Sequence, residues 1–138
     1  MFKKLIVAIV CLATILLCAF VSNRPVFEKF SSEFIVYLSK NSSNANFINS
    51  SKLNYPFISN RFGECFSSSN NEVDIQNIIN EFSAQLVFCE STDYGESYYF
   101  YSKEIKYLQL INGNKVNLHI FVGKDKIKIG SPIIYDSY

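Results

Sequence analysis

Four cysteines and one histidine are the side chains of this chain best suited to nucleophilic or redox chemistry. A thiol beside an imidazole can form a nucleophile–base pair, so His119 with Cys89 or Cys65 would suit a small hydrolase or a thiol-redox protein. Only residue type supports that pairing, because no spacing in the sequence ties the thiols to the imidazole. Alternation of apolar and polar residues instead favours a structural role for His119, on the sheet face opposite Leu118.

The cysteines fall into two groups. Cys11 and Cys18 lie in an apolar N-terminal segment, where they behave as small hydrophobic residues. Cys65 and Cys89 lie in the part of the chain expected outside the membrane, where disulfides persist. A bridge between them would close a loop of roughly 25 residues and would stabilise the fold by about 3 kcal/mol. The sequence leaves open whether that bridge forms.

Metal and cofactor motifs are not found in the sequence. There is no C-x-x-C pair, and a single histidine does not make a zinc set. Glu90, Asp93 and Glu96 cluster around one turn without the spacing of a calcium loop, so we expect a solvated acidic turn. Phosphate-loop, G-x-S-x-G and dinucleotide patterns are absent as well. We therefore expect no cofactor and no metal.

A tyrosine-rich strand is the most unusual candidate for binding. Alternation along residues 98–101 sends Tyr99 and Tyr101 to one face of the strand. Tyrosine is enriched at interfaces, because it combines an apolar ring with a polar hydroxyl. Tyr99, Tyr101 and the nearby Tyr107 are therefore candidate residues for binding a protein or a glycan. The alternative is that helices and loops cover both faces of this strand.

The first 22 residues form a separable apolar segment. Lys3 and Lys4 precede a run from Leu5 to Val21 in which Thr14 is the only polar residue. As a helix this run spans about 25 Å, slightly less than the hydrocarbon core of a bilayer. A secretory signal has this form, and so does a minimal membrane anchor. Because lysines favour the cytoplasmic side, we expect the N-terminus inside the cell membrane and the remaining residues outside.

Signal cleavage would release the domain, but the residues around the candidate sites disfavour it. Signal peptidases prefer small residues at −1 and −3, and cleavage after Ala19 or Ser22 would leave a bulky residue at −3. We expect an anchor that holds the protein in the membrane through residues 5–21. Secretion after cleavage and lipid attachment at Cys18 remain the alternatives.

Residues 23–138 are enough for a single domain. The spacing of Phe27, Phe30, Phe34 and Leu38 predicts a helix over about 25–40. The Asn- and Ser-rich stretch 41–71 predicts loops, with one short strand at most. Apolar spacing from Ile75 to Leu86 predicts a second helix over about 72–84.

The rest of the chain has a β pattern. Strands are predicted over residues 86–90, 97–102, 105–111, 116–122 and 126–129. Asn112-Gly113 supplies the residues of a tight hairpin. Lys126 and Lys128 are expected to face water, at an edge or on an open face of the sheet. The sum is an α+β domain, with two helices packed on an antiparallel sheet of about five strands.

Composition excludes two classes of protein. A formal net charge of +1 lacks the basic face that nucleic-acid binding needs. Aromatic residues make up 16% of the chain, which is far too many for a disordered protein. We therefore expect a folded extracytoplasmic domain with no nucleic-acid partner.

Three short sheet and turn motifs lie between Ser97 and Tyr138. They are Tyr98-Tyr99-Phe100-Tyr101-Ser102, then Asn112-Gly113-Asn114-Lys115-Val116-Asn117-Leu118, then Ile129-Gly130-Ser131-Pro132-Ile133-Ile134. This order resembles the YwmB family of exported Firmicutes proteins. The resemblance implies a TATA-box-binding-protein-like fold, in which a curved antiparallel sheet carries helices on one side. It also implies an association with cell-envelope and sporulation genes, and it supplies no catalytic residues.

These observations favour a non-enzymatic, membrane-anchored domain. Its expected partner is another envelope protein or a cell-wall component, bound by the tyrosine-rich strand and its neighbours. The alternative is the small secreted hydrolase or thiol-redox protein that would use Cys89 and His119.

Overall fold

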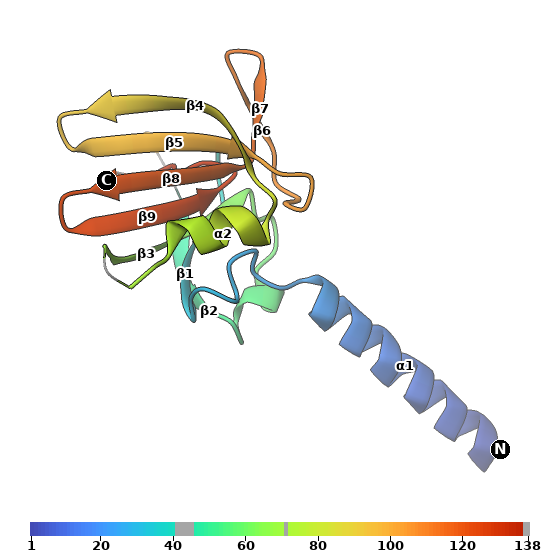
Figure 1. Cartoon of the computed structure of the whole chain (residues 1–138). Helices are drawn as coiled ribbons and strands as arrows, with labels where there is room; N and C mark the ends of the chain where they lie inside the picture. Colours follow the sequence, from blue (N-terminus) through green and yellow to red (C-terminus); the bar gives the residue numbers. More distant parts are fainter. Residues whose placement is uncertain (41–45, 71, 137–138) are drawn as a thin grey trace.

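The computed structural model describes residues 1–40, 46–70 and 72–136. Helix α1 (Phe2–Ser22) extends away from the folded domain, and none of its residues is buried (Figure 1). In the described part of the chain it is the one helix long and apolar enough to cross a membrane. The predicted N-terminal apolar helix is therefore confirmed, in a form that fits a signal or an anchor.

The domain is built on a seven-stranded antiparallel sheet in the order β2-β1-β3-β9-β8-β5-β4. Its strands are β1 (Glu33–Tyr37), β2 (Phe47–Ser51), β3 (Gly63–Ser69), β4 (Gln85–Thr92), β5 (Gly95–Tyr101), β8 (Leu118–Gly123) and β9 (Lys126–Ser131). Strands β6 (Gln109–Ile111) and β7 (Asn114–Val116) form a separate hairpin. A 3-10 helix, η2 (Tyr55–Phe57), and helix α2 (Ile75–Glu81) complete the domain.

Different segments of the chain pack on the two faces of the sheet. Helix α2 and the segment 25–31 pack on one side, which we call the helix face (Figure 1). Its buried core consists of Phe27, Phe34, Val36, Tyr55, Phe66, Ile78, Phe100, Ile105, Leu118, Ile120, Ile127 and Ile129. The C-terminal segment 132–136 crosses the opposite side, which we call the tail face, and its Tyr135 packs with Tyr37 and Cys65. The α+β class and the antiparallel sheet are thus confirmed.

The helix predicted over residues 25–40 does not form. Residues 26–30 make turns, and the following residues form β1. In β1, Phe34 and Val36 enter the core of the helix face, while Tyr37 packs on the tail face. All four residues that predicted the helix nevertheless face the same core: Phe27 and Phe34 are buried in it, and Phe30 and Leu38 pack against it. Turns followed by a strand can thus bring apolar residues to one face at a spacing that imitates a helix.

The stretch 41–71 contains more structure than its composition predicts. Besides β2 it includes β3, which lies inside the sheet between β1 and β9. Gly63, Glu64, Cys65 and Phe66 are all buried, although only Phe66 is a strong strand former. The loop prediction was therefore wrong for β3, while residues 41–45 and 71 lie outside the described residues.

Two expectations for the β region also need correction. Strand β9 lies between β3 and β8, not at an edge, and Lys128 is only 4% exposed because it pairs with Asp136. The strand predicted over 105–111 is confined to β6. The predicted hairpin is confirmed, since Asn112 and Gly113 both have positive φ, at 50° and 81°.

The second predicted helix forms, but it is shorter than 72–84. Asp74 caps α2 by accepting hydrogen bonds from the backbone N–H groups of Gln76 and Asn77. The helix ends at Glu81, and Ser83 then takes a φ of 46° as the chain turns into β4. Seven residues of helix are too few to cover the full width of a seven-stranded sheet.

Candidate functional site

Cys65 and Cys89 do not pair with each other. Cys65 lies in β3 and Cys89 in β4, and three strands of the sheet separate them. Four strand spacings of about 4.8 Å amount to about 19 Å, whereas the Cα atoms of a disulfide lie within about 7 Å. Both thiols are free, so the disulfide considered from the sequence is not formed.

The sheet also separates Cys89 from His119. Cys89 is paired with Tyr98, which packs against the core of the helix face. His119 is paired with Tyr99, the next residue of β5, and faces the tail side. Because the side chains of neighbouring strand residues point to opposite faces, these two groups do not form a nucleophile–base pair.

His119 is part of the buried tail face. Its side chain is 1% exposed, and its Nδ1 accepts a hydrogen bond of 3.2 Å from the backbone N–H of Ile134. Burial lowers the pKa of His119 to about 4. The imidazole is therefore neutral at neutral pH and holds the C-terminal segment against the sheet.

Tyr99 is the middle ring of a three-ring stack. Phe88 lies on one side and His119 on the other, each with its ring centroid 4.3 Å from that of Tyr99. The Tyr99 hydroxyl donates a hydrogen bond of 3.3 Å to Glu90. With both ring faces covered, Tyr99 can offer a partner only its edge and its hydroxyl group, and it cannot stack on a sugar.

The other two candidate binding residues, Tyr101 and Tyr107, lie outside the three-ring stack of Tyr99. Tyr101 is half-buried at the end of β5, beside a pocket of about 250 Å³ that Gln85 and Lys103 also line. The Tyr107 hydroxyl lies 2.8 Å from that of Tyr55, and burial raises the pKa of Tyr107. The structure therefore does not bring Tyr107 into one surface with Tyr99.

A buried carboxyl group, Glu64, organises the contacts around Tyr55. One of its oxygens accepts a hydrogen bond of 3.1 Å from the backbone N–H of Phe27, and the other accepts one from the Tyr55 hydroxyl. Glu64 is fully buried, and burial raises its pKa. This cluster ties the segment that follows α1 to the sheet. No local pattern indicates this cluster, because β3 has the composition of a loop.

A second polar cluster lies on the tail face around Cys65. The Tyr37 hydroxyl is 2.9 Å from Cys65 Sγ and donates to Asp136, which also pairs with Lys128. Burial is the main cause that raises the pKa of the Cys65 thiol to about 12. A protonated, buried thiol is a poor nucleophile, so this cluster has a structural role.

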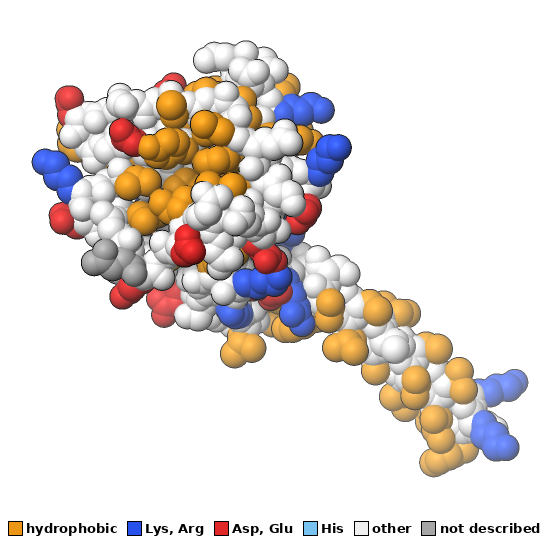
Figure 2. All heavy atoms as spheres, in the orientation of Figure 1, with side chains coloured by type: hydrophobic (Ala, Val, Ile, Leu, Met, Phe, Trp, Pro, Cys, Tyr) orange, Lys and Arg blue, Asp and Glu red, His pale blue; other side chains and the backbone are white. Residues whose placement is uncertain are grey.

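An apolar groove opens on the helix face. It has a volume of about 390 Å³ and lies between α2 and the strands β4, β5 and β8. Its lining consists of Ile75, Ile79, Leu86, Tyr98, Phe100, Ile120 and Val122. Figure 2 shows the apolar atoms of this face gathered over β4, β5 and β8, beside α2. The groove exists because α2 is short and leaves this part of the sheet uncovered.

Strand β4 borders the groove and is an edge of the sheet. It is eight residues long, and Glu90 is the only charged residue in it. It has no lysine and no proline, the residues that usually protect an edge from pairing with another strand. Leu86, on the groove side of β4, is 55% exposed. The local pattern indicates the tyrosine-rich strand β5 but not the groove beside it, because the groove depends on the order of strands from distant parts of the chain.

Among the described residues, no group of three or more His, Cys, Asp or Glu side chains could hold a metal ion.

Comparisons with known proteins give no relative for this chain. No family model, curated protein or solved structure matches the chain. The YwmB resemblance therefore stays an expectation.

Proposed function

We propose that the protein is a membrane-anchored, non-enzymatic binding domain that takes up an extended segment of another envelope protein along β4. The observation that carries the proposal is the apolar groove beside an unprotected edge strand. Extended peptides bind in this way by adding a strand to the edge of a sheet, with alternate side chains filling neighbouring pockets. Leu86 of β4 lines the groove, so side chains of the added strand that lie beside Leu86 would enter the groove.

The chemistry of the groove favours a protein partner over a glycan. Tyr98 supplies its only polar side-chain group, and that hydroxyl already donates to Glu96. A sugar would leave its hydroxyl groups without partners there, whereas apolar side chains would lose only their contact with water. The opposite edge of the sheet, β2, is shorter, and the pocket beside it is lined mainly by serines, Asn49 and Glu33.

The membrane anchor would determine on which side of the cell membrane the partner is bound. An uncleaved α1 with Lys3 and Lys4 inside would hold the groove on the outer side of the cell membrane. The YwmB resemblance supports the same place, with a role in envelope biogenesis or sporulation. The alternative function, a secreted hydrolase or thiol-redox protein, is not favoured because Cys89 and His119 lie on opposite faces of the sheet.

Site-specific photocrosslinking tests the proposed function. A photoreactive phenylalanine is placed in the full-length protein at Leu86 or at Ser91, which alternate pairing puts on the same side of β4. We expect both positions to crosslink to one partner protein, at points about five residues apart in one segment, because an added strand advances in step with β4. Mass spectrometry of the crosslinked peptides measures that spacing.

A matched control is available on the β6–β7 hairpin. Leu110 is 62% exposed, similar to Leu86, and lies outside the main sheet. The same probe at Leu110 should not crosslink to the partner segment. Crosslinks from Leu86 that equal those from Leu110, or that scatter over unrelated partner regions, would contradict binding along β4.

A further inference from the structure

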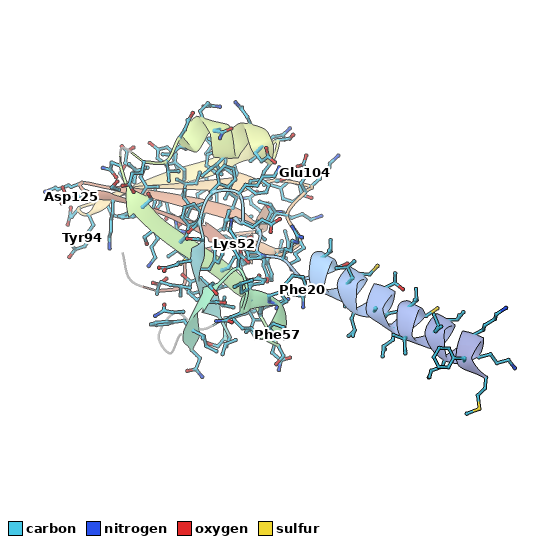
Figure 3. The ribbon with its side chains drawn as sticks, turned by 90° about the horizontal axis from the view of Figure 1, so that it is seen from below. Phe20, Lys52, Phe57, Tyr94, Glu104 and Asp125 are labelled. Atoms are coloured by element: carbon cyan, nitrogen blue, oxygen red, sulfur yellow. The ribbon has the colours of Figure 1, made fainter. Side chains whose placement is uncertain are left out.

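The connection between β2 and β3 carries exposed apolar side chains next to the outer end of α1. Phe57 is 80% exposed and Leu53 is 74% exposed. The ring of Phe57 lies against that of Phe20 in α1, with 6.4 Å between the centroids. Figure 3 shows Phe57 and Phe20 together where α1 meets the domain. Large exposed apolar groups that gather beside an apolar helix mark a contact site for a membrane or another protein.

The length of the apolar segment places the Phe20 and Phe57 rings no farther out than the outer boundary of the hydrocarbon core. Residues 5–21 span about 25 Å as a helix, against about 30 Å for the hydrocarbon core. With Lys4 at the inner boundary, the last turn of the segment, including Phe20, reaches no farther than the outer boundary. Phe57 packs against Phe20 and therefore lies at the same depth.

The backbone around η2 is suited to a place with little water. The carbonyl oxygen of Pro56 accepts a hydrogen bond of 3.1 Å from the Asn23 side chain. Arg61 donates to the carbonyl oxygens of Tyr55 and Ile58, at 2.8 Å and 2.5 Å, and also to the Asn23 side chain. Unpaired backbone groups are costly near lipid, so this internal pairing lowers the cost of placing the loop there.

The same hydrogen bonds fix the loop to the end of α1. Asn23 is the residue directly after the helix, and it bonds to both Pro56 and Arg61. Lys52 is exposed directly after β2, in the same connection between β2 and β3 as Phe57. A lysine near an exposed aromatic ring is typical of side chains that lie at a membrane surface, where the lipid headgroups are often anionic.

We propose that the loop 52–58 enters the outer interface of the bilayer that α1 spans, with the Phe57 ring against lipid. The inference rests on the proposed membrane anchor, and it adds a second contact that sets the orientation of the domain. That orientation keeps η2 at the membrane and the β4–β5 turn, with Tyr94, far from it (Figure 3).

Tryptophan fluorescence can test this inference, because the chain contains no tryptophan. Full-length Phe57→Trp is reconstituted in vesicles of phosphatidylcholine and phosphatidylglycerol, with and without lipids brominated near the headgroup end of the acyl chains. We expect a blue-shifted emission and several-fold stronger quenching by the brominated lipids than for Tyr94→Trp. Both replaced side chains are largely exposed, so neither change disturbs the core.

A third variant separates this inference from the membrane anchor itself. Ile15→Trp lies near the middle of α1, about halfway across the hydrocarbon core, and should be quenched by lipids brominated near the ends of the acyl chains whenever the helix is inserted. Quenching of Ile15→Trp without quenching of Phe57→Trp would overturn the loop contact and leave the anchor standing. If Phe57→Trp is blue-shifted but is not quenched, protein rather than lipid covers the ring, which also overturns the inference. If Ile15→Trp is not quenched, the anchor fails, and the loop contact fails with it.

Discussion

Replacing Glu64 by alanine is expected to lower the free energy of unfolding by about 3 kcal/mol, because it leaves buried polar groups without their acceptor. The backbone N–H of Phe27 and the Tyr55 hydroxyl both donate to this carboxyl group. Phe27 is fully buried, so its backbone N–H is shielded from bulk water. Urea unfolding of the full-length protein in detergent micelles, followed by far-UV circular dichroism, measures the change.

Two further variants control this prediction. Glu64→Gln keeps the size of the side chain and an acceptor oxygen. It should therefore lower the free energy of unfolding clearly less than Glu64→Ala does. Glu33→Ala removes an exposed carboxyl group from β1 and should change stability by less than about 0.5 kcal/mol. If Glu64→Ala were no more harmful than Glu33→Ala, the carboxyl group would not organise the junction between α1 and the sheet.

Acidification from pH 7 to pH 4 is expected to remove about 3 kcal/mol of stability through His119 alone. The pKa of His119 is lowered from 6.5 to about 4 by burial, so the unfolded chain binds a proton that the folded chain does not. The stabilisation is complete above pH 6.5 and is lost as the pH falls towards 4. Unfolding curves at pH values between 7 and 4 measure it.

The variant His119→Phe isolates this contribution from that of the carboxyl groups. It keeps a ring beside Tyr99 but removes the titrating nitrogen and the acceptor for Ile134. At pH 7 we expect a loss of about 1 kcal/mol from the missing hydrogen bond. At pH 4 the variant should be at least as stable as the wild type. Parallel pH dependence of the two proteins would show that His119 is not buried as described.

Local patterns predicted several parts of this fold. Hydropathy alone identified α1, and Asn112-Gly113 identified the β6–β7 turn. The alternation of Leu118 and Ile120 identified β8. In each case, a single stretch of sequence carries the whole physical signal.

Features that depend on distant contacts could not be predicted in the same way. The turns at 26–30 and strand β1 send their apolar residues to one core and so imitate a helix, whereas β3 contains a buried Glu64 next to small polar residues. Lys128 is buried only because Asp136 comes back to pair with it. The groove likewise arises from the order β8-β5-β4 and from the shortness of α2. These are products of the topology and not of local propensity.

We propose that an uncleaved α1 holds this domain on the outer side of the cell membrane. Cys89 is an exposed free thiol of the domain, whereas Cys65 is buried, and Cys11 and Cys18 lie in the apolar helix. A membrane-impermeant maleimide applied to intact cells should therefore add one label to the full-length, membrane-bound protein, and Cys89→Ser should abolish it. Labelling only after the cells are opened, or a labelled protein that lacks α1 and leaves the membrane, would contradict the account.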